Sequence, residues 1–530
     1  MRLREALSVL SKSSPYAVST DSKYSKPSGL LDQIKMDFYI PMPIEYRVSE
    51  VIEHLNSSSR QVFFLCGSSG DGKSELLIQS KNKLGPNIRL HLDATHSFDP
   101  HENAVQTLDK VFDEFEQGEF SLIVGINVGM LANYGQEGRN EVFKSAINAY
   151  QNNKKQISGF IFVDFENYPK FQITKNGIQA DFARKLLARI TSPESMLFSI
   201  YKQESTKPLD ADSQLLVINY RLLCASEVQE VIVELLFKAR LVRDQFLTAR
   251  ALLDFVYQLL TGAGYLFDNL FSGGDNELAD KLEEFDPALL RTKAIDRFLM
   301  AADLKLKNEQ LDIFCAEVEA KYDIPKLENP KSYIRLFYIL RNSNLETNFH
   351  QQFQQDFAQR LLTDYLDVYR LHAFYDDTAE IREKLKAFYN KQLISALRLY
   401  INRNAPQLSN RQFLVSQLGT YKIAAELDLK PDIAALKANT VVKQHAFKAQ
   451  LKVGNEVLAI DININLFELL ERINAGYRPS KNDRSAVILL SEIASKIALI
   501  ARESSELLIS SESAQYKFSL DDDYIEAEEL

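Results

Sequence analysis

A glycine-rich run near residue 70 contains the residue types that bind phosphate. Residues 67–74 read GSSGDGKS and fit the pattern G-x-x-x-x-G-K-[ST]. In such a loop the glycines let successive backbone N–H groups point at phosphate oxygens, the lysine reaches the β- and γ-phosphates, and the hydroxyl ligates Mg²⁺. The residues expected to bind the nucleotide are Gly67, Ser68, Ser69, Gly70, Asp71, Gly72, Lys73, Ser74 and Glu75.

The segments on either side of the loop match the strand and helix that it requires. Residues 62–66 (VFFLC) form a continuous apolar run, which predicts a strand buried on both faces. Residues 74–79 are mainly helix formers, so the loop would lie at a helix N-terminus, where the dipole favours anions. A chance match is the alternative, but the flanking segments favour a nucleotide site that holds ATP and Mg²⁺.

Hydrolysis would also need an acid at a neighbouring strand end to hold Mg²⁺, and usually a carboxylate to orient water. Two predicted strand ends supply acids: Asp93 follows RLHL, and Asp164 with Glu166 follows GFIFV. If the core resembles the AAA+ type, the strand after the acid ends in a polar residue that senses the γ-phosphate. Asn127, after LIVGI, would be that residue, and Asp93 would then ligate the metal beside Ser74.

The sequence leaves both acids open. Asp93 comes only 20 positions after Lys73, which leaves no room for the extra strand that such cores usually contain. Asp164 follows the better apolar run, and strand alternation would put Glu166 on its face, but it comes late in the chain. For either acid the alternative is a strand-end residue that caps the next helix.

Arginines in the helical part are further candidates. Arg250, in DQFLTARALLDFVYQLLTG, resembles the lid arginine with which AAA+ proteins touch nucleotide phosphates, and a helix-surface arginine is the alternative. In a homo-oligomer, a neighbouring subunit's nucleotide could be reached by Arg291, Arg335 or Arg341. The candidate catalytic residues are therefore Asp93, Asn127, Asp164, Glu166 and Arg250.

The composition is that of a folded chain with several domains. With 530 residues it is too long for one ordinary core, and 45% of its residues are hydrophobic. No apolar run approaches the roughly 20 residues that span a bilayer, and the amino terminus is too polar for a secretory signal. We therefore expect a cytoplasmic protein that does not contact the membrane.

Charge argues against a general polyanion binder. The net charge is −10, and the tail DDDYIEAEEL (521–530) holds six acids and no base. Basic residues in the stretches 2–35 and 474–484 could still contact DNA locally.

Cysteine and histidine spacing predicts no structural metal or disulfide. Cys66, Cys224 and Cys315 lie far apart in apolar surroundings, which predicts buried core thiols. His91, His96 and His101 recur at intervals of five, which suits no single helix face. The only metal expected is therefore the Mg²⁺ of a nucleotide.

The order of elements predicts an α/β core followed by helices. Strand-like and helical runs alternate at 62–66, 88–94, 102–117, 121–127, 138–152 and 157–166, the pattern of a parallel sheet. Helical patterns then dominate to about residue 400, and 447–464 predicts a β-hairpin with Gly454-Asn455 at its turn. The expected fold is an α/β P-loop NTPase core with an AAA+-like parallel sheet, a large mainly α-helical region and a small α+β C-terminal part.

Five segments follow from this pattern. They are 1–59, packing on the core; 60–200, the P-loop NTPase core; 201–300, a helical lid; 301–404, a helical domain; and 405–530, the α+β region with the acidic tail.

Three stretches of the core resemble one family. CGSSGDGKSELL (66–77), LHLDATHSFDPHENAVQTLD (90–109) and LIVGINVGMLANYG (122–135) are similar to the DptF family, the ATPase-like components of bacterial DNA phosphorothioation-dependent restriction systems. The resemblance covers roughly residues 60–170, and only the phosphate loop, 67–74, is carried over residue by residue.

The resemblance implies a part in antiviral defence. Such systems replace a non-bridging phosphate oxygen of host DNA with sulfur, and a three-protein complex attacks DNA that lacks this mark. This chain would be the nucleotide-driven member, with partners of the DptG and DptH type and with DNA reached directly or through them. The alternatives are a stand-alone P-loop phosphotransferase and a scaffold that binds nucleotide without turnover.

Overall fold

The computed structural model describes residues 1–13, 29–57, 60–94, 103–152, 154, 156–243, 247–438, 445–480, 483–504, 506–511, 514–521 and 524–530. Contacts divide the chain into two compact units. Unit 1 comprises Met1–Phe171, Gln179–Ala239 and Gln245–Ala358, and unit 2 comprises Gln172–Ile178, Arg240–Asp244 and Gln359–Leu530. The five segment borders predicted from the sequence are not marked by this division and stay predictions.

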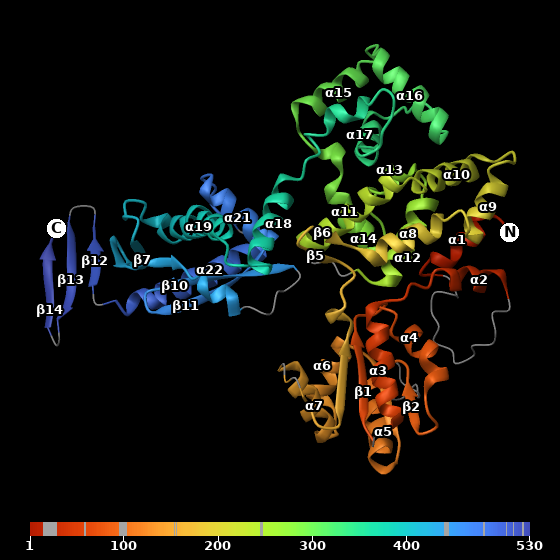
Figure 1. The fold of residues 1–530 in the computed structure, drawn as a ribbon. Coiled ribbons are helices and arrows are strands. Elements are labelled where there is room, and N and C mark those ends of the chain that lie inside the picture. The colour runs from red at the N-terminus through yellow and green to blue at the C-terminus, as the bar shows by residue number, and fades with distance from the viewer. Residues whose placement is uncertain are drawn as a thin grey trace. The chain divides into compact units, whose positions relative to one another are not determined.

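Unit 1 contains a four-stranded parallel sheet with strand order β2-β3-β1-β4 (Figure 1). Its strands are β1 (Val62–Gly67), β2 (Ile88–His91), β3 (Ser121–Asn127) and β4 (Phe160–Asp164). All six residues of β1 are buried, which confirms the predicted strand buried on both faces. Residues 68–87, all of them described, contain no strand, so none is inserted between β1 and β2.

Helices cover both faces of this sheet. Phe63 and Leu65 of β1 pack with α3 (Pro43–Ser57) and α4 (Lys73–Ser80). Phe64 and Cys66 point the other way and pack with α5 (Ala104–Gln117), α6 (Val128–Glu137) and α7 (Glu141–Gln151), because successive strand residues face opposite sides. The helices that follow β1 and β3 therefore lie on opposite faces. The carboxyl ends of β1 and β3 are therefore the position at which open α/β sheets commonly bind ligands.

The rest of unit 1 is mainly helical. The start of the chain is held by two backbone hydrogen bonds: Leu3 N–H donates to Glu204 Oε2 at 2.6 Å, and Lys12 N–H donates to Asp254 Oδ1 at 2.8 Å. The helices are α1 (Leu3–Leu7), α2 (Leu30–Asp37), α8 (Asp181–Thr191), α9 (Met196–Glu204), α10 (Ala211–Leu223), α11 (Ser226–Arg243, ending in unit 2), α12 (Ala249–Thr261), α13 (Leu266–Asn269), α14 (Glu277–Leu282), α15 (Lys293–Asp303), α16 (Glu309–Tyr322) and α17 (Pro330–Ile339).

Unit 2 combines helices with antiparallel sheets. Its helices are α18 (Arg360–Ala373), α19 (Ala379–Phe388), α20 (Ser395–Ile401), α21 (Ile464–Asn474) and α22 (Arg484–Arg502). One sheet has the order β11-β10-β9, a second β14-β13-β12-β8-β7, and a third is the pair β5-β6. The strands are β5 (Gln172–Thr174), β6 (Gly177–Gln179), β7 (Gln412–Leu418), β8 (Tyr421–Glu426), β9 (Leu429–Pro431), β10 (Ala446–Val453), β11 (Glu456–Asn463), β12 (Glu506–Ser510), β13 (Gln515–Asp521) and β14 (Tyr524–Glu529).

Two sequence predictions are met in unit 2. The hairpin is confirmed: β10 pairs with β11 in antiparallel register, and Gly454 takes φ +59° at the turn. Helix and strand also mix in the last part of the chain, as expected for an α+β region. None of the helices in the described part of the chain combines the length and apolar character needed to cross a bilayer.

Candidate nucleotide-binding site

The backbone of loop 67–74 favours glycine at three positions. Gly70 and Gly72 have φ values of +83° and +98°, a region that side-chain-bearing residues rarely adopt. A Cβ at Gly67 would lie 3.0 Å from the Cβ of Phe165, so a side chain there would require Phe165 to shift. The turn between β1 and α4 therefore requires glycine at Gly70 and Gly72 and favours it at Gly67.

The N-terminus of α4 faces the loop without a side-chain cap. Gly72 is the N-cap, and no side chain accepts from the first turn of α4 at that cap. By contrast, α5, α6 and α7 are each capped by an asparagine: Asn103, Asn127 and Asn140. The N–H groups of a first helical turn lack intrahelical partners, and with the helix dipole they attract an anion. The residues of the loop therefore fit a phosphate group.

Lys73 bends back over the loop. Its Nζ donates to the backbone oxygens of Ser68 at 2.8 Å and Gly67 at 3.2 Å. Burial lowers the pKa of Lys73, while the carboxylates of Asp71, Asp93 and Asp164 raise it. Both candidate metal acids therefore lie within the electrostatic environment of the loop lysine.

Ser74 lies beside the segment that carries Asp93. The Ser74 hydroxyl donates to the backbone oxygen of Leu92, the residue before Asp93, at 3.3 Å. A Cβ at Gly125 of β3 would come within 2.5 Å of the same oxygen, so only glycine permits this close approach. A lone glycine in the strand pattern SLIVGIN is the sequence signal for such a contact. The structure thus places Ser74, one predicted Mg²⁺ ligand, in contact with the segment that carries the other, Asp93.

Asp164 is placed differently. Its side chain is buried, with 8% of the residue exposed, and both carboxylate oxygens accept hydrogen bonds: Oδ1 from the N–H of Glu166 and Oδ2 from the hydroxyl of Tyr150, each at 2.9 Å. Burial and this carboxylate raise the pKa of Tyr150. The expectation that Glu166 shares a strand face with Asp164 is wrong, because β4 ends at Asp164 and Glu166 lies in a 3₁₀ turn, Phe165–Asn167.

Asn127 ends β3 directly beside the start of the loop, in register with Gly67. Its Oδ1 accepts from the N–H of Met130 at 2.6 Å and so caps α6. This cap uses only the oxygen of the amide, and the Nδ2 group is not part of it. The residue therefore has the structural role of a helix cap at the predicted sensor position.

The first turn of α12 also reaches the loop. The backbone N–H of Arg250 donates to the oxygen of Gly70 at 3.3 Å. A Cβ at Gly70 would lie 3.2 Å from both the Cβ of Arg250 and the Oγ1 of Thr248, the N-cap of α12. The predicted lid arginine is thus on a helix that touches the phosphate loop.

Sequence reasoning missed Lys170. Its Nζ lies 2.7 Å from Asp71 Oδ1 in a buried ion pair, and Asp71 Oδ2 accepts from the N–H of Ser68 at 2.7 Å. The partners are 99 residues apart in the chain, and no local pattern marks the pairing.

The other arginines are engaged within unit 1. Arg335 pairs with Asp268 at 2.8 Å and Asp286 at 2.7 Å, and Arg341 pairs with Glu234. Arg291 is largely exposed beside Asp296. A role toward a neighbouring subunit stays a prediction.

The thiols and histidines supply no metal centre in the part of the chain that the structure describes, where no group of three or more His, Cys, Asp or Glu side chains could hold an ion. His96 and His101 lie outside the described residues. Cys66 is a buried free thiol, but Cys224 and Cys315 are only half-buried, which corrects the prediction of three buried thiols. Cys315 lies on α16, and Cys224 directly follows the last residue of α10.

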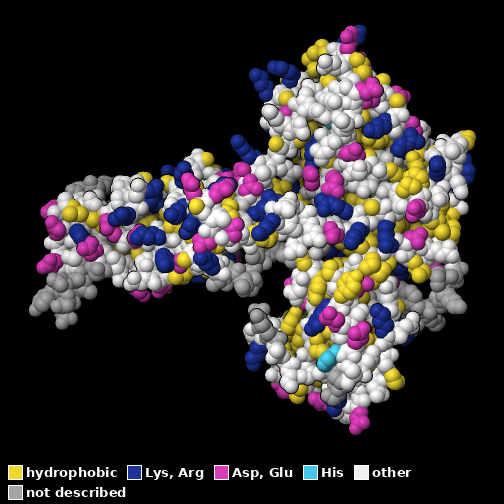
Figure 2. Space-filling model, in the orientation of Figure 1, with side chains coloured by type: hydrophobic (Ala, Val, Ile, Leu, Met, Phe, Trp, Pro, Cys, Tyr) yellow, Lys and Arg dark blue, Asp and Glu magenta, His cyan; other side chains and the backbone are white. Residues whose placement is uncertain are grey.

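Charge on the visible surface singles out no DNA site. Basic and acidic side chains are interspersed over the face shown in Figure 2. In the basic stretch 474–484, the carboxylate of Asp483 accepts hydrogen bonds from Tyr477 and from Arg472, which precedes the stretch. Part of this stretch is therefore held in a local hydrogen-bond network. Residues 14–28 of the other stretch lie outside the described residues.

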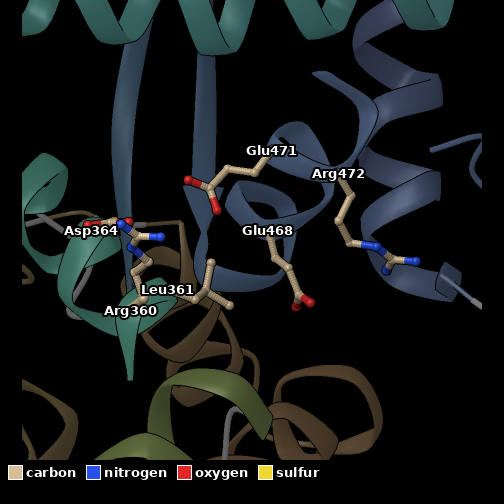
Figure 3. A pocket seen from close by; sticks show the side chains of 6 residues that line it. All are labelled: Arg360, Leu361, Asp364, Glu468, Glu471 and Arg472. Carbon is tan, nitrogen blue, oxygen red and sulfur yellow. The ribbon is translucent and has the colours of Figure 1, made fainter. Parts of the chain in front are cut away.

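Unit 2 has an open cleft of about 610 Å³ between α18 and α21 (Figure 3). It is lined by Arg360, Leu361, Asp364, Glu468, Glu471 and Arg472, of which Arg472 points away from the others. Burial, Asp364 and Glu468 raise the pKa of Glu471, while Arg360 lowers it. A raised pKa means that ionised Glu471 destabilises the folded state.

Glu471→Gln is therefore expected to raise the free energy of unfolding at neutral pH, by less than about 1 kcal/mol because the site is open to solvent. The gain should shrink as pH falls toward the raised pKa, because wild-type Glu471 is then protonated in the folded state. Urea unfolding at neutral and mildly acidic pH measures this, with exposed Glu456→Gln as the control. A gain that does not depend on pH would contradict the electrostatic cause.

Comparison with family models, with curated proteins and with solved structures gave no match.

Proposed function

We propose that this chain binds ATP with Mg²⁺ at loop 67–74 and hydrolyses it, as a P-loop NTPase with an AAA+-like core. The observation that carries the proposal is the loop itself. It joins the buried strand β1 to α4, has positive φ at Gly70 and Gly72, and presents a helix N-terminus without a side-chain cap beside Lys73. Uncapped amides, a dipole and a lysine together are the groups that bind polyphosphate.

Each neighbouring residue then has a defined task. Lys73 would exchange its two loop carbonyl acceptors for phosphate oxygens. Ser74 and Asp93 would hold Mg²⁺, which would neutralise phosphate charge when bound. The Nδ2 group of Asn127 would donate to the terminal phosphate, and the Arg250 side chain, on the helix that touches Gly70, would contact phosphate from the side.

Two observations favour Asp93 over Asp164 as the metal acid. The Ser74 hydroxyl touches the residue before Asp93, and both oxygens of Asp164 already accept hydrogen bonds from Tyr150 and Glu166. A carboxylate committed to two donors in a buried site is suited to a structural role.

We further propose that turnover serves a DNA phosphorothioation-dependent restriction complex, with partners of the DptG and DptH type. This step rests on the resemblance of residues 60–170 to the DptF family. The contact between Gly70 and α12 supports a coupling in which the state of the loop shifts the attached helices, because phosphate contacts can order or release such segments.

One observation favours a second candidate, a subunit that binds ATP but relies on a partner for turnover. The residue after Asp93 is Ala94, so the next position in the sequence carries no second carboxylate that could orient water. A carboxylate that could orient water instead is Glu166, which is exposed in the turn after β4.

Phosphate release by the purified chain tests these proposals. We expect release from ATP with Mg²⁺ and without any phosphate acceptor, which a stand-alone phosphotransferase would require. Adding unmodified or phosphorothioated DNA should give different rates if the chain takes part in sensing the mark. ATP binding without release under any of these conditions would favour the second candidate, and absence of ATP binding would contradict both.

A further inference from the structure

The phosphate loop contains a carboxylate of its own. Asp71 lies between Gly70 and Gly72, and its side chain turns inward, because Oδ2 accepts from the Ser68 N–H at 2.7 Å. The same oxygen would lie 3.1 Å from a Cβ at Gly67. An anion at this position would repel the phosphates that the loop is proposed to bind, since like charges a few ångströms apart disfavour one another.

Lys170 is placed to cancel that charge. Its Nζ lies 2.7 Å from Asp71 Oδ1, and the side chains of Lys170 and Asp71 are only 6% and 10% exposed. Solvent and salt screen buried charges weakly, so the attraction between Lys170 and Asp71 is reduced much less than that of a surface ion pair. The rings of Phe165 and Phe182 lie 5.9 Å and 5.8 Å from the same nitrogen and enclose it further.

Lys73 does not replace Lys170 in this role. In the structure Lys73 Nζ donates to the carbonyls of Gly67 and Ser68, and in the proposed function it turns to the phosphates. The cation that stays beside Asp71 when nucleotide binds is then Lys170.

We propose that Lys170 is a positioning residue for nucleotide binding: it neutralises Asp71, so that this carboxylate can shape the loop through Ser68 without repelling phosphate. The inference rests on the proposed function. It predicts opposite effects for the two halves of the ion pair. A purely structural ion pair predicts that losing either half weakens binding together with folding.

Calorimetric titration of ATP into the full chain, with melting curves of each variant, tests this. Lys170→Met should weaken ATP binding roughly tenfold or more, because an uncompensated buried charge remains in the loop. Asp71→Asn should bind ATP more tightly than wild type, because the carboxylate that would repel phosphate becomes a neutral amide. The double variant should return to within about threefold of wild type, and Lys170→Arg should bind like wild type.

Lys144→Met is the matched control, since the ion pair of Lys144 with Glu141 lies on the surface of α7. Parallel losses of affinity in Lys170→Met and Asp71→Asn, tracking their melting temperatures, would overturn the inference. If Lys170→Met does not fold, Asp71→Asn alone decides, because weaker ATP binding by that variant also overturns it. Wild-type chain that binds no ATP would refute the proposed function itself, whereas ATP binding that Lys170→Met leaves intact would refute only this inference.

Discussion

Lys73→Ala is expected to remove ATP binding in the concentration range where the wild-type chain is saturated, and to abolish phosphate release. In the proposed function the ammonium group bonds to phosphate oxygens, and hydrogen bonds to charged groups contribute about 1.5–3 kcal/mol each. Losing two such bonds weakens binding by roughly a hundredfold or more. Titration with ATP and a phosphate-release assay measure the two effects.

The control for this variant is Lys81→Ala, because Lys81 is exposed just beyond the end of α4. It should bind and hydrolyse ATP like wild type. The Lys73→Ala chain itself should still fold, since the two carbonyls that Lys73 contacts lie in a part-buried loop. Unchanged ATP binding by a folded Lys73→Ala chain would contradict the assignment of loop 67–74 as the nucleotide site.

Asp93→Asn and Asp164→Asn are expected to separate catalysis from folding. Asp93→Asn should bind ATP but release phosphate at a rate lower by roughly a hundredfold, because a neutral amide is a poor Mg²⁺ ligand and loses several kcal/mol of charge stabilisation. Its melting temperature should stay near that of wild type, since Asp93 is only half-buried.

Asp164→Asn should behave in the opposite way. The amide keeps its oxygen as acceptor for the Glu166 N–H and turns its NH₂ group toward Tyr150, whose oxygen can accept but whose O–H then loses the carboxylate as acceptor. A buried mismatch of this kind costs about 1–3 kcal/mol. We expect a lower melting temperature and near-normal turnover per folded molecule. Loss of turnover in Asp164→Asn with a normal Asp93→Asn would reverse the assignment of the metal acid.

Local sequence patterns anticipated much of the core. The run VFFLC becomes β1, and the stretches 88–94, 102–117, 121–127 and 157–166 contain β2, α5, β3 and β4. The apolar runs predict β1 and β3 well because a strand covered on both faces must be apolar throughout. Gly70 and Gly72 could likewise be predicted from the sequence, because the positive φ of such a turn excludes most other residues.

The features that could be predicted from the sequence are therefore short-range: the strand, turn and helix that form the loop, and the hairpin around Gly454. The remaining features of the site depend on long-range packing. The contact of Ser74 with the residue before Asp93 depends on the close approach of that segment to Gly125 of β3, and the turn at Asp164 depends on where β4 ends. The pairing of Lys170 with Asp71 joins residues 99 positions apart. Such contacts are set by how the sheet and its helices pack, which no local periodicity encodes.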